Sequence, residues 1–201
     1  YDALRAQRRD IFFSLSNNHV KNLYAGIEEV STVANAWRTT TDIVDNWGRV
    51  ANDIGFAQDR WAKYARPGHF NDADMLWVGL AGLSEAENRA HFSLLALMAS
   101  PLLVGSDLTK LSVAEVAMLS NSEIIELDQD ALGLQGNLID QQGDVGVYAK
   151  PLSDCGARGV VLLNRGERTA DATVSWDALG LSSGAASVRD LWAARELDAA
   201  R

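Results

Sequence analysis

Two groups of polar residues have the types and the spacing that acid–base chemistry requires. In the first group Arg38 precedes Asp42 by four residues, and in the second Asp72 and Asp74 stand on either side of Ala73. An arginine near an aspartate offers a rigid set of hydrogen-bond donors beside a titratable acid, which suits the binding of sugar hydroxyls or of a carboxylate. Both groups fall where a predicted strand gives way to a loop or helix. In an α/β barrel such strand ends converge on one face, where catalytic groups gather.

Each group also has a structural interpretation. Asp42 could cap the helix that follows it, and the segment 71–74 has the composition of a turn held by side-chain-to-backbone hydrogen bonds. Metal binding is a further alternative for the second group, but its oxygen ligands do not follow the calcium-loop pattern. We therefore predict no metal and no cofactor. Trp37 and Trp47 could form a platform for a sugar, but a core position is favoured. The histidines are expected to be structural because they lack metal-ligand spacing: His19, His69 and His91.

Alternating strand and helix patterns predict the framework that positions these groups. Short apolar runs indicate strands, and apolar residues at every third or fourth position indicate helices. Ser84 and Glu87 have the spacing of a capping box, which would open a long helix. This alternation is typical of an α/β architecture with parallel strands. The predicted strands are 11–15, 37–40 and 74–79, and the predicted helices are 1–10, 19–33, 43–54, 84–98, 112–120 and 122–128.

The last third of the chain has a different pattern. Short strand candidates recur at intervals of roughly 13 to 15 residues, separated by Gly, Ser and Asp turns, which indicates an antiparallel all-β module. We place the domain boundary between residues 138 and 139, so that 1–138 form an α/β unit and 139–201 begin a β-domain. The predicted strands of this module are 144–150, 159–164, 172–176 and 187–192.

Composition excludes several classes of partner. The 27 acidic and 18 basic residues give a net charge of -9, so no positive field is available to hold nucleic acid or an anionic membrane. The single cysteine, Cys155, excludes an internal disulfide, and the apolar run 94–105 is too short to span a membrane. The chain begins at Tyr1 with neither an initiator methionine nor a leader pattern, so any signal peptide is absent or was removed. Among the possible locations, a secreted or periplasmic one is favoured over the cytoplasm.

Four longer motifs follow one another over residues 11–135. They are Trp37-Arg38-x-x-x-Asp42 with Trp47, Gly68-His69-Phe70-Asn71-Asp72-Ala73-Asp74-Met75-Leu76, Ser100-Pro101-Leu102-Leu103-x-Gly105-Ser106-Asp107-Leu108, and Asn121-x-Glu123-Ile124-Ile125 with Asp128-Gln129-Asp130-Ala131-Leu132-Gly133. In this order and spacing they resemble glycoside hydrolase family 27, the α-galactosidases and α-N-acetylgalactosaminidases. The segment 144–164 is similar to the start of that family's C-terminal β-domain. The resemblance implies the later part of a (β/α)₈ TIM barrel, followed by an incomplete, sandwich-like antiparallel β-domain.

The resemblance also implies an activity and a set of site residues. Members are retaining hydrolases that cleave terminal α-D-galactosyl residues from oligosaccharides or glycoconjugates by double displacement. By position, Asp42 matches the general acid/base, Arg38 a residue that hydrogen-bonds the sugar, and Asp74 and Met75 residues that line the pocket. Ser16 matches the position near the sugar's 2-substituent, where a serine leaves room for an acetamido group. An α-galactoside is the favoured substrate, with an N-acetylgalactosaminide or a β-L-arabinopyranoside as alternatives.

One part of the family's pattern has no match in this chain. The nucleophile, an aspartate in a Lys-x-Asp or similar motif, is expected before Tyr1, because Asp2 and Asp10 lie in a polar, helix-favouring stretch. A retaining mechanism needs two carboxylates, so we expect residues 1–201 alone to be inactive and to require the N-terminal part of the barrel. About 250 residues make up a complete barrel, which agrees with this expectation. A non-catalytic carbohydrate-binding remnant is the remaining alternative.

Overall fold

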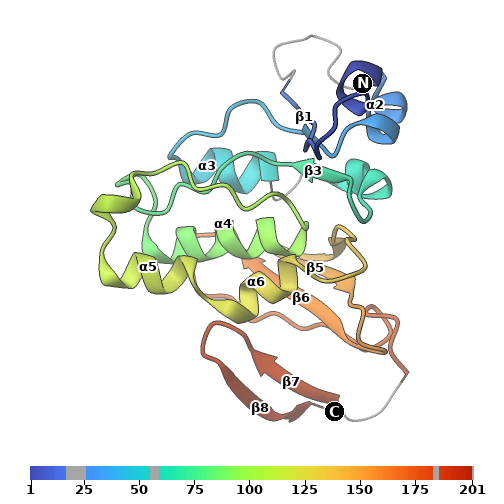
Figure 1. The fold of residues 1–201 in the computed structure, drawn as a ribbon. Coiled ribbons are helices and arrows are strands. Elements are labelled where there is room, and N and C mark those ends of the chain that lie inside the picture. The colour runs from blue at the N-terminus through green and yellow to red at the C-terminus, as the bar shows by residue number, and fades with distance from the viewer. Residues whose placement is uncertain (17–25, 55–58, 183–185, 201) are drawn as a thin grey trace.

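The computed structural model describes residues 1–16, 26–54, 59–182 and 186–200 (Figure 1). The strands of this part are β1 (Ser14–Leu15), β2 (Ala36–Arg38), β3 (Phe70–Asp72), β4 (Asn137–Gln142), β5 (Val145–Pro151), β6 (Arg158–Asn164), β7 (Ala186–Asp190) and β8 (Arg195–Ala200). The helices are α1 (Asp2–Arg5), α2 (Ile27–Val33), α3 (Trp47–Arg49), the π-helix η1 (Val50–Ile54), the 3-10 helix η2 (Asp59–Tyr64), α4 (Glu85–Leu97), the 3-10 helix η3 (Leu108–Lys110), α5 (Val113–Leu119) and α6 (Ser122–Asp128). In the described residues, no helix combines the length and the apolar character that a membrane crossing requires.

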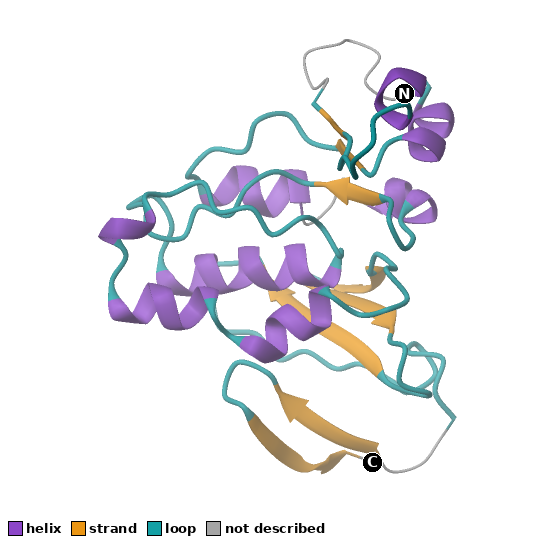
Figure 2. Cartoon of the chain, viewed as in Figure 1, coloured by secondary structure: helices purple, strands orange, loops and turns teal. Residues whose placement is uncertain are grey.

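Helix α4 lies in the middle of the molecule, with the parallel strands on one side and the antiparallel strands on the other (Figures 1 and 2). Its Phe92 and Leu95 are buried in a hydrophobic cluster that also contains Ile43 and Leu76 from the parallel side and Leu163 from β6. One continuous core therefore joins the two parts of the chain. Because this core fixes α4 from both sides, it also fixes the ends of the parallel strands.

The strands β1, β2 and β3 form a parallel sheet in that order. Leu15 lies opposite Trp37, and Arg38 lies opposite Asp72. The parallel pairing continues beyond β3, where Leu76 forms a bridge with a segment after α4. Since parallel strands end at the same edge of a sheet, the residues that follow β1, β2 and β3 lie side by side. The predicted parallel α/β architecture is therefore confirmed.

The strand predicted at 74–79 is wrong. The extended segment is β3, which ends at Asp72, and pairing resumes only at Leu76. Between them Asp74 has a φ of 81°, a left-handed conformation that aspartate tolerates better than most residues. The amide of Asp74 donates to Oδ1 of Asp72 at 2.8 Å, which stabilises this turn. The chain therefore leaves the sheet just before the predicted strand would begin.

The helix predictions were confirmed in part. Ser84 Oγ accepts a hydrogen bond from the amide of Glu87, and the Glu87 carboxylate accepts one from the amide of Ser84, so the predicted capping box opens α4. The two helices predicted at 112–120 and 122–128 are α5 and α6. The helix predicted at 1–10 is shorter, and the one predicted at 19–33 is described only from residue 26. The helix predicted from 43 begins at Trp47.

The antiparallel part contains one three-stranded sheet, in the order β4-β5-β6, and the separate hairpin β7–β8. Strands predicted at 144–150, 159–164 and 187–192 correspond to β5, β6 and β7. The strand predicted at 172–176 is wrong, because Thr173 bonds through its backbone to the Gln142 side chain rather than to a neighbouring strand. Strands β4 and β8 were not predicted, and the boundary proposed after residue 138 falls inside β4.

The β7–β8 hairpin is held on the helices by a tryptophan at its turn. Trp192 Nε1 donates to Ser93 Oγ of α4 at 2.9 Å, and its ring meets Phe92 edge-on with centroids 6.0 Å apart. Beside it, the Arg189 guanidinium forms two hydrogen bonds of 2.7 Å with the carboxylate of Glu123 on α6. The hairpin is therefore attached to both α4 and α6, and not only to its own domain.

The Trp192→Phe substitution should lower the free energy of unfolding of the full-length protein by about 1 kcal/mol. Phenylalanine keeps the edge-on contact with Phe92 but loses the hydrogen bond to Ser93. The cost stays small because Ser93 Oγ still donates to the carbonyl of Arg89 at 2.8 Å. Thermal unfolding of Trp192→Phe, Ser93→Ala and the double variant measures this coupling. Strictly additive effects would show that the two side chains do not interact.

Candidate functional site

Arg38 brings the two predicted acids together at the end of β2. Its Nη2 atom lies 2.5 Å from Oδ2 of Asp74 and 3.5 Å from Oδ1 of Asp42. The side chains of Arg38 and Asp74 are 11% and 5% exposed, whereas that of Asp42 is 66% exposed. One guanidinium nitrogen thus joins a buried carboxylate to a solvent-facing one. The structure thus brings Asp74 beside Arg38 and Asp42, although Asp74 lies more than thirty residues further along the chain.

The Asp74 carboxylate accepts hydrogen bonds from three neighbouring groups. Its Oδ2 accepts hydrogen bonds from Arg38 and from the amide of Ile43 at 2.7 Å, and its Oδ1 accepts one from the amide of Met75 at 2.8 Å. These three hydrogen bonds fix the orientation of the carboxylate. Because Ile43 follows Asp42 directly, Asp74 also fixes the main chain beside the exposed acid.

The loop after β2 is fastened to the end of β3. The amide and hydroxyl groups of Thr39 both donate to the carbonyl oxygen of Asp72, at 2.8 and 3.1 Å. Burial raises the pKa of the Asp72 carboxyl, although the amide of Asp74 and the charge of Arg38 act in the opposite direction. Asp72 therefore holds the turn that presents Asp74, which fits part of the structural interpretation of this segment.

Ser16 and Met75 lie at the same edge of the sheet. Ser16 is exposed and follows β1, whose last residue, Leu15, is paired with Trp37 directly before Arg38. Met75 is half-buried and follows Asp74. Ser16, Arg38 and Asp74 therefore lie in that order along one edge, at or just after the ends of the three strands.

Several structural alternatives from the sequence can now be decided. Asp42 does not cap the following helix, because α3 begins at Trp47 and the side chain of Asn46 accepts the capping hydrogen bond. Trp37 is 1% exposed and donates from Nε1 to Asn71 Oδ1 at 2.8 Å, so it is a core residue. Trp47 is half-buried and packs against the same core.

Groups with strongly shifted pKa values lie elsewhere. Burial lowers the pKa of His91 on α4 to about 4, raises that of Asp128 on α6 to about 7 and lowers that of Lys150 on β5 to about 8. Lys150 donates to a carbonyl of α4 at 3.2 Å. Burial is the largest cause of all three shifts. His69 Nδ1 lies 2.8 Å from the carbonyl oxygen of Ala34, and His19 is outside the described residues.

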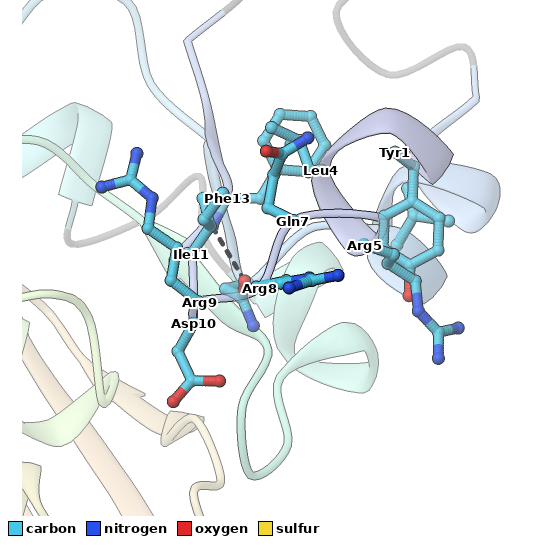
Figure 3. Close-up of a pocket in the computed structure, with 11 residues that line it drawn as sticks. Tyr1, Leu4, Arg5, Gln7, Arg8, Arg9, Asp10, Ile11 and Phe13 are labelled. Carbon is cyan, nitrogen blue, oxygen red and sulfur yellow. Dashed lines mark hydrogen bonds between the residues drawn. The ribbon is translucent and has the colours of Figure 1, made fainter.

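Two cavities in the described residues are also separate from this site. One, of about 490 Å³, is lined mainly by the N-terminal segment 1–13, where the amide of Phe13 donates to Asn35 Oδ1 at 2.8 Å (Figure 3). The other, of about 310 Å³, is lined by Phe12, by the start of β3 with the residues before it, by the segment 99–101 after α4 and by the end of α6 with the residues after it. Neither is lined by Arg38 or the acids that it contacts. Within the described part of the chain, no cluster of three or more His, Cys, Asp or Glu residues has a metal-binding arrangement.

Arg49 is a site residue that the sequence did not reveal. From α3 its Nη2 donates to Thr41 Oγ1 at 2.5 Å and to the carbonyl oxygen of Asp42 at 3.2 Å. It also lies 2.9 Å from Oδ2 of Asp53. The sequence offers one weak indication of this role. Arg49 is a cation in the first turn of a helix, where acidic residues are favoured.

Two family models match the chain. The model described as alpha galactosidase A matches residues 1–130. The model described as the alpha galactosidase C-terminal beta sandwich domain matches residues 142–200. The first match covers the parallel strands and the site, and the second covers most of the antiparallel strands.

Individual relatives agree with these matches. An α-galactosidase from Oryza sativa subsp. japonica is 44% identical over 195 residues, which are 96% of this chain and 45% of that protein. The crystal structure of α-galactosidase I from Mortierella vinacea is similar with a TM-score of 0.90 and 28% identity, over 98% of this chain and 55% of the other. A β-L-arabinopyranosidase from Geobacillus stearothermophilus has a TM-score of 0.88 and 26% identity, over 100% of this chain and 48% of the other. The chain thus spans about half the length of these proteins.

Proposed function

Because this chain belongs to glycoside hydrolase family 27, the α-galactosidase family, we propose that the whole protein is a retaining glycosidase that removes terminal α-D-galactosyl residues from galactosides. The fold is that of the later part of the TIM barrel followed by the family's C-terminal β-domain. The observation that best supports the proposal is the contact of one Arg38 nitrogen with both Asp42 and Asp74. Two residues that act on one sugar ring must be this close.

In the proposed mechanism Asp42 is the general acid and base. A nucleophilic carboxylate attacks the anomeric carbon, the bond to the leaving oxygen breaks, and Asp42 gives its proton to that oxygen. Water then attacks the same carbon, Asp42 takes the proton of the water, and the ester bond to the nucleophile breaks. The 66% exposure of the Asp42 side chain is compatible with transfer to a leaving group that approaches from solvent. We place the nucleophile in the N-terminal part of the barrel, outside residues 1–201.

The other residues would bind the sugar. Asp74 holds Arg38 in one orientation, so the Arg38 guanidinium can donate to a sugar hydroxyl without losing further side-chain entropy. Met75 would supply apolar contact beside it. Ser16, exposed at the end of β1, would face the 2-substituent and so influence the choice between galactose and N-acetylgalactosamine.

The proposal is tested on the full-length protein with three p-nitrophenyl substrates: the α-galactoside, the α-N-acetylgalactosaminide and the β-L-arabinopyranoside. We expect the highest kcat/KM with the α-galactoside, and no turnover by residues 1–201 alone, because the retaining mechanism needs both carboxylates. A higher kcat/KM with another substrate would reassign the specificity. Binding of galactose without hydrolysis of any substrate would contradict the enzyme and support a carbohydrate-binding role.

A further inference from the structure

The loop that carries Asp42 is held from two sides. On one side Arg38 Nη2 donates to the carbonyl oxygen of Thr41 at 3.4 Å, and Asp74 accepts from the amide of Ile43. On the other side Arg49 donates to the Thr41 hydroxyl and to the carbonyl oxygen of Asp42. The Asp42 carboxylate itself is 66% exposed, and its contact with Arg38 is long, at 3.5 Å. The main chain that carries this carboxylate is therefore held by both arginines.

Arg49 occupies a position that helix stability alone does not favour. It is the third helical residue after the cap Asn46, and its amide donates to that cap at 3.2 Å. The amino end of a helix carries partial positive charge, so acidic residues are preferred there and a cation is disfavoured. The side chain compensates by lying against Asp53, four residues further on, with 2.9 Å between Nη2 and Oδ2. The cation is thus kept at the helix start with its donors turned toward the Asp42 loop.

The helix geometry directly after Arg49 is unusual as well. The segment Val50–Ile54 is a π-helix, a rare form that is frequently found at functional sites. Because Asp53 lies within it, the π-helix sets the position of the carboxylate that holds Arg49. The segment that follows the Asp42 loop in the chain therefore combines three features. It has a cation at the start of a helix, an acidic partner for that cation and a rare helix form.

We propose that Arg49 is a positioning residue for Asp42. By fixing the main chain of Thr41 and Asp42, it keeps the Asp42 carboxyl directed at the leaving-group oxygen. This inference rests on the proposed glycosidase function. Proton transfer to a leaving group depends steeply on distance and angle, so a looser loop would weaken acid catalysis and leave sugar binding intact.

The test compares two leaving groups in the full-length protein. Methyl α-galactoside needs protonation of its leaving oxygen, whereas p-nitrophenyl α-galactoside needs little. Arg49→Met should lower kcat/KM for the methyl glycoside by about 10-fold or more and for the p-nitrophenyl glycoside by at most about 3-fold. Asp53→Asn should give a smaller loss with the same preference, and Arg49→Lys should restore part of the activity, because it keeps the charge and one donor.

Arg89→Met is the matched control. Arg89 is 48% exposed and pairs with Glu85 four residues away at 2.8 Å, as Arg49 is 41% exposed and pairs with Asp53. The control should retain the wild-type kcat/KM for both glycosides. If Arg49→Met lowered kcat/KM equally for both glycosides, or lowered it for neither, the inference about Arg49 would be overturned. The proposed function would still stand in that case, because the wild-type protein would be active. A wild-type protein that hydrolyses neither glycoside would overturn the proposed function itself.

Discussion

Replacing Asp42 by asparagine in the full-length protein is expected to lower kcat/KM for methyl α-galactoside by about 10²- to 10⁴-fold, the usual contribution of general acid catalysis. Asparagine has nearly the same shape but cannot supply the proton that the leaving oxygen needs. With p-nitrophenyl α-galactoside the first step should suffer less, because that leaving group departs without protonation. Steady-state kinetics on the two substrates measures the difference.

The fold should not change in this variant. The Asp42 side chain is 66% exposed, and substitutions at exposed positions usually alter stability little. Asp154→Asn, at an exposed position in the turn between β5 and β6, is the matched control and should keep wild-type activity. Wild-type turnover of methyl α-galactoside by Asp42→Asn would remove Asp42 from its assigned role.

The second large effect is expected for Asp74→Asn, which should destabilise the full-length protein by about 3 kcal/mol and abolish most activity. Asp74 and Arg38 are 5% and 11% exposed and lie 2.5 Å apart. Removing the charge of Asp74 leaves the buried Arg38 with only the longer contact, of 3.5 Å, to the exposed carboxylate of Asp42. Asparagine tolerates the left-handed backbone of this position, so the loss can be assigned to the charge and not to strain. Thermal unfolding and kcat/KM are measured together.

The exposed ion pair between Lys110 and Asp107 provides the comparison. Their side chains are 81% and 49% exposed, and their charged atoms lie 3.2 Å apart. Lys110→Met should leave the midpoint of thermal unfolding close to the wild-type value, because solvent screens exposed pairs. If Asp74→Asn unfolded at the same temperature as Lys110→Met and remained active, the buried pair would not organise the site.

Much of the fold could be predicted because local patterns determine it. The capping box at Ser84, the apolar periodicity of α4 and the apolar runs of β5 and β6 all lie within short windows of sequence. Elements that depend on pairing were missed. The sequence of β4 is polar and becomes a strand because it pairs with β5, and the strand predicted at 74–79 failed because Asp74 adopts a left-handed conformation.

The site was predictable in its members but not in its contacts. The motifs identified Arg38, Asp42 and Asp74, yet only the structure shows that Asp74 holds Arg38 and the amide of Ile43 at once. Those hydrogen bonds join segments more than thirty residues apart. Arg49 could not be found from spacing, because its contact with the Asp42 loop depends on where α3 begins.

The role of Asp42 is tested most directly by azide rescue of the Asp42→Ala variant of the full-length protein, with p-nitrophenyl α-galactoside as substrate. The nucleophile should still form the galactosyl ester, but water, which needs a base, should release it slowly. Azide needs no base, so it should raise the turnover rate and yield α-galactosyl azide, in which the configuration is retained. The absence of any azide product, or the formation of β-galactosyl azide, would contradict the assignment of Asp42 as the general acid and base.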